Sequence, residues 1–181
     1  MPSKLVKCSR LKRTAAGCAL AFLFSVVTHA VVYMTPLEYA RTVFGASAPK
    51  SKVVWLEGRI AEQVKAILGH EYPQLRVRYW RQGNRSVWAL KEVGKEEYIT
   101  VGITVANGVI TDVRVLEYRE SRGDEVRHKF FTKQFYGVYL TQNNQLSKHI
   151  DGITGATLSV QALIKVSKMA LLLDQVTRPK P

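Results

Sequence analysis

The strongest constraint on the fold is the alternation of apolar and polar side chains over residues 98–118. Two alternating segments flank Asn107-Gly108, a residue pair that is typical of turns. Alternation with a period of two gives each segment one apolar face, and a short turn places both faces on the same side of a sheet. The sequence therefore predicts an antiparallel hairpin with one buried face.

The register of this hairpin follows from its charged residues. A two-residue loop at Asn107-Gly108 pairs Ile103 with Asp112, which places a carboxylate on the apolar face. A three-residue loop that begins one residue earlier pairs Val105 with Val109 and keeps this face apolar. We therefore expect the three-residue loop, with Gly108 in the left-handed bulge position.

Further elements flank the hairpin on both sides. Residues 76–81 and 86–93 predict two strands around a polar turn, and residues 59–68 predict a helix from their apolar spacing. Residues 158–176 carry a wide apolar stripe, which predicts a long buried helix at the end of the domain. Together these patterns predict an α+β fold, with an antiparallel sheet centred on hairpin 98–118 and packed by helices.

The first thirty residues have the pattern of an export signal. A basic segment precedes an apolar run from Ala15 to Val27, and Thr28-His29-Ala30 is a small-x-small cleavage site. The alternative is an uncleaved anchor, because apolar character resumes up to Met34 and makes residues 15–34 about long enough to span a bilayer. We favour cleavage after Ala30. In both cases the rest of the chain is expected outside the cytoplasm, in the periplasm, since the basic residues stay inside.

Composition limits the chemistry of the chain after this segment. Removal of residues 1–30 takes away five basic residues and no acidic ones, so the formal charge falls from +13 to +8. Both cysteines lie in the removed segment, which excludes disulfides, iron–sulfur clusters with Cys ligands and Cys-linked haem from residues 31–181. Redox chemistry in this domain would need an organic cofactor or a metal without Cys ligands.

Other motifs favour no enzyme class. The basic, aromatic segment at residues 76–85 resembles a single-stranded nucleic-acid surface, but export argues against a nucleic-acid partner. The same segment suits a solvated hairpin or a docking surface for an acidic partner. His70, His128 and His149 are spaced too widely to indicate a metal site, and no hydrolase, Walker or dinucleotide-binding fingerprint occurs.

The chemistry of the chain is concentrated in a short segment, Asp151–Thr157. Gly155 and Ala156 precede Thr157 and leave its hydroxyl open, and a helical pattern begins at Leu158. A helix N-terminus presents unpaired N–H groups and a partial positive charge, so it would hold a phosphate ester on Thr157 well. The same residues also suit an ordinary helix cap, with Thr154 or Thr157 bonding the first free N–H groups.

The full string Asp151-Gly152-Ile153-Thr154-Gly155-Ala156-Thr157 resembles the flavinylation motif of the FMN-binding domain family. This family includes the C subunit of the sodium-pumping NADH:quinone reductase and the G subunit of the Rnf complex. The segment with Glu120 and Gly123 is similar to the family's Glu-x-x-Gly segment, which faces the flavin, and residues 134–137 are similar to its Phe-x-Gly element. The resemblance covers about residues 98–173.

The resemblance implies a cofactor site around Thr157. In this family a flavin transferase moves FMN from FAD onto the last Thr of the motif, so Thr157 would carry FMN as a phosphoester. Asp151 would assist recognition or metal binding during the transfer. The resemblance places the cofactor among these residues: Thr157, Ala156, Gly155, Thr154, Asp151, Leu158, Glu120 and Gly123.

The resemblance also implies a role and partners. The chain would be an electron carrier or redox subunit rather than a stand-alone enzyme, with an FMN-binding domain over residues 58–176 after an N-terminal arm and linker over residues 31–57. Its partners would be the flavin transferase, a membrane quinone-linked or haem redox protein, and a terminal reductase. The alternative is a cofactor-free, basic extracytoplasmic interaction module in which Thr157 is only a helix cap.

Overall fold

The computed structural model describes residues 30–179, and the export signal predicted over residues 1–30 lies almost wholly outside them. An antiparallel sheet of six strands forms the centre, in the order β1-β6-β5-β4-β3-β2. Its strands are β1 (Val31–Val32), β2 (Lys52–Trp55), β3 (Arg76–Gln82), β4 (Arg85–Val93), β5 (Tyr98–Ala106) and β6 (Val109–Tyr118). The α+β fold with an antiparallel sheet is therefore confirmed.

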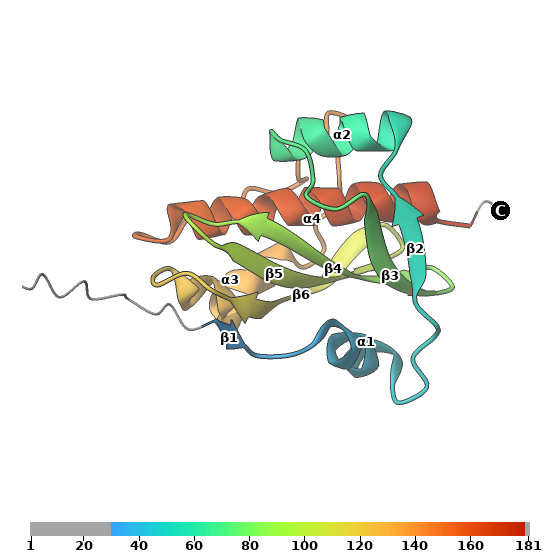
Figure 1. Ribbon diagram of the computed structural model, residues 1–181, viewed down its shortest axis with the longest axis horizontal. Helices are drawn as coiled ribbons and strands as arrows, with labels where there is room; N and C mark the ends of the chain where they lie inside the picture. The colour runs from blue at the N-terminus through green and yellow to red at the C-terminus, as the bar shows by residue number, and fades with distance from the viewer. Residues whose placement is uncertain (1–29, 180–181) are drawn as a thin grey trace, which may run out of the picture.

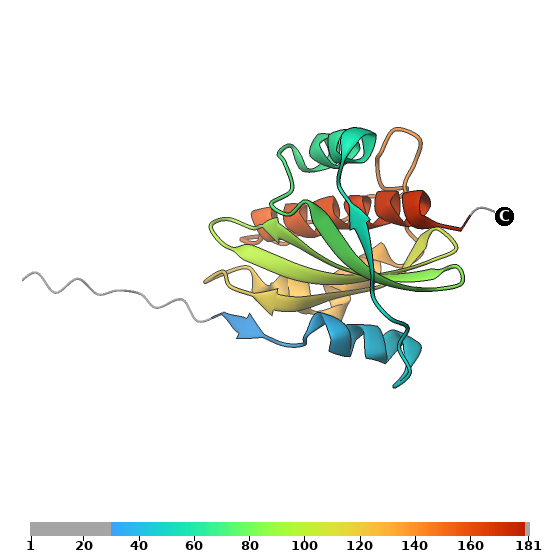
Figure 2. The same cartoon turned by 45° about the vertical axis from the view of Figure 1, so that its right-hand side comes forward.

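Helices cover both faces of this sheet (Figure 1). The long helix α4 (Thr157–Thr177) lies along one face, and α2 (Gly58–Leu68) packs on its outer side. Helix α1 (Pro36–Phe44) lies against the opposite face, as the turned view in Figure 2 also shows. Three short helical turns follow β6, namely η1 (Asp124–Arg127), α3 (Lys129–Thr132) and η2 (Lys133–Phe135).

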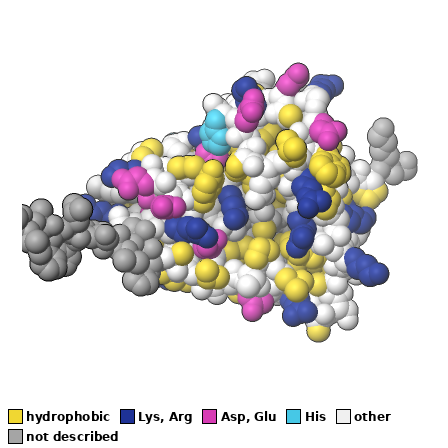
Figure 3. Space-filling model, viewed as in Figure 1, with side chains coloured by type: hydrophobic (Ala, Val, Ile, Leu, Met, Phe, Trp, Pro, Cys, Tyr) yellow, Lys and Arg dark blue, Asp and Glu magenta, His cyan; other side chains and the backbone are white. Residues whose placement is uncertain are grey.

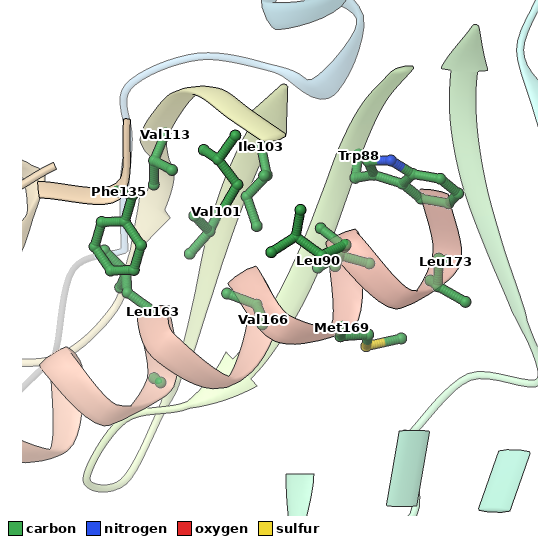
Figure 4. Close-up of a cluster of buried hydrophobic side chains, with 14 of the residues drawn as sticks. Trp88, Leu90, Val101, Ile103, Val113, Phe135, Leu163, Val166, Met169 and Leu173 are labelled. Carbon is green, nitrogen blue, oxygen red and sulfur yellow. The ribbon is translucent and has the colours of Figure 1, made fainter. Parts of the chain in front are cut away.

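The main core lies between the sheet and α4 (Figure 4). Leu90, Val101 and Ile103 of the central strands point toward Val166 and Met169 of α4, and all five side chains are buried. Apolar residues at a period of two on the strands and on a wide stripe of α4 produce this contact, as the sequence predicts. The observed helix α4 is one residue longer at each end than the helix predicted over residues 158–176.

The register predicted for the β5–β6 hairpin is wrong. The turn is the two-residue loop, with Ala106 opposite Val109, and both Asn107 and Gly108 have positive φ. Mirror-image two-residue turns require this conformation. A bulge at Thr111 then shifts the register, so that Ile103 lies opposite Val113 rather than Asp112. The bulge keeps the charge off the buried face, which the three-residue loop was expected to do.

Residues 31–57, for which the sequence predicts an arm and a linker, are built into the sheet. β1 pairs with the end of β6 and β2 pairs with β3, so this stretch supplies both edge strands as well as α1. Val31 and Val32 are extended, so the apolar residues 31–34 do not continue a helical anchor. No helix within residues 30–179 has the length and apolar character needed to cross a membrane.

Candidate functional site

A pocket of about 590 Å³ lies where three separate segments meet. One wall is the start of α4, a second is the chain just after β6, and the third is the β4–β5 loop. The structure therefore brings the Thr157 segment and the Glu120 segment together, although they are far apart in the sequence. The lining residues are Lys95, Glu96, Glu120, Ser121, Arg122, Gly155, Ala156, Thr157, Leu158 and Ser159.

Thr157 is the first residue of α4, and its side chain is exposed in this pocket. The cap position is Ala156, and no side chain caps the helix there. The first α-helical hydrogen bond runs from Val160 N–H to the carbonyl of Ala156, so the N–H groups of residues 157–159 precede it. The helix-cap interpretation of Thr157 is therefore not supported by the structure, and the helix N-terminus remains available for an anion.

Leu158 adds an apolar surface beside the Thr157 hydroxyl. Its side chain lines the pocket and is 50% exposed, although leucine at the start of a buried helix usually packs inward. Lys95 and Arg122 line the same pocket and add cationic groups near the helix N-terminus. Glu96 and Glu120 line the pocket as well, so the positive character that suits an anion comes from the free N–H groups at the start of α4, beside the apolar wall of Leu158.

Tyr118 and Gly123 join the two main walls. The Tyr118 hydroxyl donates to the carbonyl of Arg122 at 2.6 Å and is 3.0 Å from the buried Ser159 hydroxyl on α4. Burial raises the pKa of Tyr118 above its usual range. Gly123 has a φ of 89°, and a Cβ there would lie 2.8 Å from Ser159 Oγ. Any side chain at residue 123 would therefore be strained and would also crowd the Ser159 and Tyr118 hydroxyls.

Glu120 holds the third wall in place. Its Oε1 atom accepts backbone N–H bonds from Lys95, from Glu96 at 2.8 Å and from Glu97 at 3.0 Å. Three amide donors on one carboxylate oxygen form an anion nest that folds the β4–β5 loop toward the pocket. The carboxylate is thus occupied by this loop, while the Glu120 residue itself lines the pocket.

Asp151 and Thr154 lie at the surface beside the pocket rather than in its lining. The Asp151 carboxylate is 83% exposed and 3.9 Å from His149 Nε2. Its backbone N–H donates to Gln134 Oε1 at 2.8 Å, which ties the motif to the segment that resembles the Phe-x-Gly element. The Asp151 carboxylate is therefore accessible to a second protein, while its backbone is fixed.

Sequence reasoning missed half of the pocket lining. Four of the missed residues come from turns, where no pattern marks them, and the fifth comes from α4; they are Lys95, Glu96, Ser121, Arg122 and Ser159. Ser159 alone left a signal, because it is a polar residue within the apolar stripe of α4. Within residues 30–179, no group of three His, Cys, Asp or Glu side chains is arranged to hold a metal ion.

Comparison with known protein families gives one match. Residues 94–172 match the family model described as the FMN-binding domain. This span begins in the β4–β5 loop and includes Glu120, Gly123 and the whole Asp151–Thr157 motif, so it covers every segment of the pocket. No curated protein matches the chain.

Proposed function

We propose that this chain carries FMN covalently on Thr157 and works outside the cytoplasm. The proposal starts from the family: residues 94–172 belong to the FMN-binding domain family, which gives the chain a flavin-binding, electron-transfer role. The observation that carries this proposal is the position of Thr157. Its exposed hydroxyl lies at the uncapped N-terminus of α4, inside the pocket that the family match covers.

The residues of the pocket fit the cofactor. The volume of about 590 Å³ lies within the range of about 300–1,000 Å³ usual for small-molecule sites. The free N–H groups at the start of α4 suit the phosphate, and the exposed Leu158 suits the apolar ring system. FMN supplies one- or two-electron transfer when it is bound. The protein positions the cofactor and keeps it from being lost.

Attachment requires a partner enzyme. The Thr157 hydroxyl oxygen attacks the FMN phosphorus of FAD, the bond between the two phosphates breaks, and AMP leaves while the hydroxyl proton passes to a base of the flavin transferase. The exposed Asp151 carboxylate supports recognition by that transferase or binding of its metal ion. Glu120 and Gly123 act indirectly, by fixing the β4–β5 loop and the start of α4 around the site.

The chain is exported and exchanges electrons with partners in the periplasm. The basic and apolar residues 1–30 direct export, with cleavage after Ala30, to the periplasm. Electron partners there are a membrane quinone-linked or haem redox protein and a terminal reductase. The chain then serves as a carrier between them, and a covalent link prevents loss of FMN to the medium.

Intact mass tests the proposal. The chain is produced with and without an active flavin transferase, and the wild type with transferase should gain one FMN minus one water while losing residues 1–30. Thr157→Val should carry no adduct yet remain folded, because Thr157 is exposed and caps nothing. Thr154→Val is the matched control and should still be loaded. An adduct on Thr157→Val, or none on the wild type, would show that the covalent assignment is wrong.

A further inference from the structure

Part of one sheet face is left uncovered by the helices. The side of the sheet opposite α4 is packed by α1 through a small core of Tyr39, Ala40, Trp80, Val87 and Leu116. This core ends at Trp80, and β2 and the first half of β3 extend beyond it (Figures 1 and 2). The pairing of Val53 with Arg78 and of Trp55 with Arg76 places these four side chains together on the uncovered face.

The uncovered face carries large exposed apolar side chains. Val53 is 44%, Trp55 51% and Leu75 74% exposed, and these residues line a hollow of about 620 Å³ together with Arg76 and Arg78. The Arg76 guanidinium lies 5.8 Å from the centre of the Trp55 ring. We call these five residues the β2–β3 surface. Exposed aromatic and Arg residues in a hollow are the usual anchors of protein interfaces.

The charge of this surface is strongly positive. Arg76 and Arg78 form no ion pair with any residue in the range 30–179, and no Asp or Glu lines the hollow. Figure 3 shows dark-blue basic side chains among yellow apolar ones on the side of the molecule where β2 and β3 lie. A surface of this kind favours an acidic partner and disfavours a second copy of itself, because like charges would meet.

The backbone of β2 is also available for pairing. β2 is the last strand in the sheet order and pairs only with β3 among the described strands. An edge strand presents unpaired N–H and C=O groups to which an extended peptide can add. The open edge of β2 therefore lies beside the apolar hollow, which also contains the unpaired Arg76 and Arg78.

We propose that the β2–β3 surface docks an extended, acidic segment of a partner protein, which adds to β2 as a further strand. Its carboxylates lie near Arg76 and Arg78, and an apolar side chain packs against Trp55 and Val53. This surface lies away from the start of α4 (Figure 1), so docking does not depend on the cofactor.

Peptide binding tests this proposal. The probe is a fluorescent peptide of about ten residues with the repeat Glu-Ser-Val-Ser and blocked ends, which places Glu and Val on the same face of the added strand, and binding is measured by anisotropy with the full exported chain. Two comparison peptides carry Lys in place of Glu or Pro in place of alternate Val. We expect binding of the acidic peptide only, because Lys reverses the charge and Pro cannot pair along an edge.

Variants locate the binding. Arg76→Glu with Arg78→Glu should weaken binding by about tenfold or more, and Trp55→Ala should weaken it as well. Lys129→Glu with Lys133→Glu makes the same change in charge on α3 and η2, and should bind as the wild type does.

Four outcomes would overturn the proposal. The first is no binding of the acidic peptide at about 1 mM. The second is equal weakening by both double variants, which would show a nonspecific charge effect. The third is binding to vesicles with about 30% anionic lipid, but not to peptide, which would show a membrane surface. The fourth is a dimer that Trp55→Ala dissociates, which would show that a second copy covers this surface.

Discussion

At the scale of single residues, Glu120 connects the pocket to the rest of the fold. Its carboxylate would be expected to face a ligand, but it accepts three N–H bonds from the β4–β5 loop instead. Such a residue affects a pocket through the position of the loop that it binds, rather than through direct contact with a ligand. The effect of a substitution at this position should therefore appear first in the loop.

Glu120→Ala should loosen residues 95–97. Loss of the carboxylate frees three amides, so their hydrogen exchange should speed up by about tenfold or more, and stability should fall by about 1 kcal/mol. In the loaded protein the flavin absorbance should shift while the mass adduct remains. Glu96→Ala, whose carboxylate only pairs with Lys95 at the surface, is the control. Unchanged exchange at residues 95–97 in Glu120→Ala would contradict this role.

At the scale of elements, α4 joins the pocket at its start to a buried ionic network at its other end. Asp174 Oδ1 accepts from Arg81 Nη2 and from Ser86 Oγ, both at 2.6 Å, and Asp174 Oδ2 accepts from Arg178. The side chains of Arg81 and Asp174 are 3% and 0% exposed. The network fixes the end of α4 on β3 and β4, about 25 Å along the helix from Thr157.

Asp174→Ala should destabilise the domain strongly without changing the site. The substitution leaves the buried Arg81 guanidinium unpaired, so urea denaturation should show a loss of about 3 kcal/mol. Loading of Thr157 below the denaturation midpoint should stay normal. Asp124→Ala removes a carboxylate from a half-exposed pair with Arg127 and should cost less than about 1 kcal/mol. Equal losses in the two variants would argue against the network.

At the scale of the whole molecule, stability should depend on pH through His70. Its Nε2 lies 2.9 Å from Glu92 Oε1, and Lys165 Nζ lies 3.3 Å from the same atom. The bond to Glu92, and a second to the Glu71 carbonyl, raise the pKa of His70 above its usual 6.5. Protonated His70 thus stabilises the fold fully below pH 6.5, and this stability is lost as pH rises through the higher folded pKa.

Unfolding measured at several pH values checks this dependence. The free energy of unfolding should decrease as pH rises above about 6.5, and His70→Gln should flatten this decrease. The exposed His128, changed in His128→Gln, is the control and should leave the slope as in the wild type. A slope that survives His70→Gln would assign the pH dependence to other groups.

The sequence predicted those parts of the molecule that follow a regular period. The strands of hairpin 98–118 and the helix from residue 158 have long apolar patterns, and both were found. The bulge at Thr111 was missed because the pattern alone fits any register that keeps one face apolar. The edge strands β1 and β2 were missed because two or four residues are too few to show alternation.

For the site, the motif predicted Thr157 and its neighbours but not the contacts that build the pocket. Glu120 was expected to face a ligand, since nothing in the sequence shows that its carboxylate bonds a loop more than twenty positions earlier. Such contacts depend on the three-dimensional path of the backbone. Whether these residues bind the flavin stays a prediction.

The pairing of β1 with β6 fixes the distance between the start of the domain and the pocket. Val31 lies opposite Tyr118, whose hydroxyl contacts both Arg122 and Ser159 at the pocket walls. The chain thus enters the domain one strand spacing, about 4.8 Å, from the strand that leads into the site. Anything that holds Val31 therefore also holds the pocket at a short and nearly fixed distance. A partner bound at Val31 would therefore meet the pocket at a nearly constant distance.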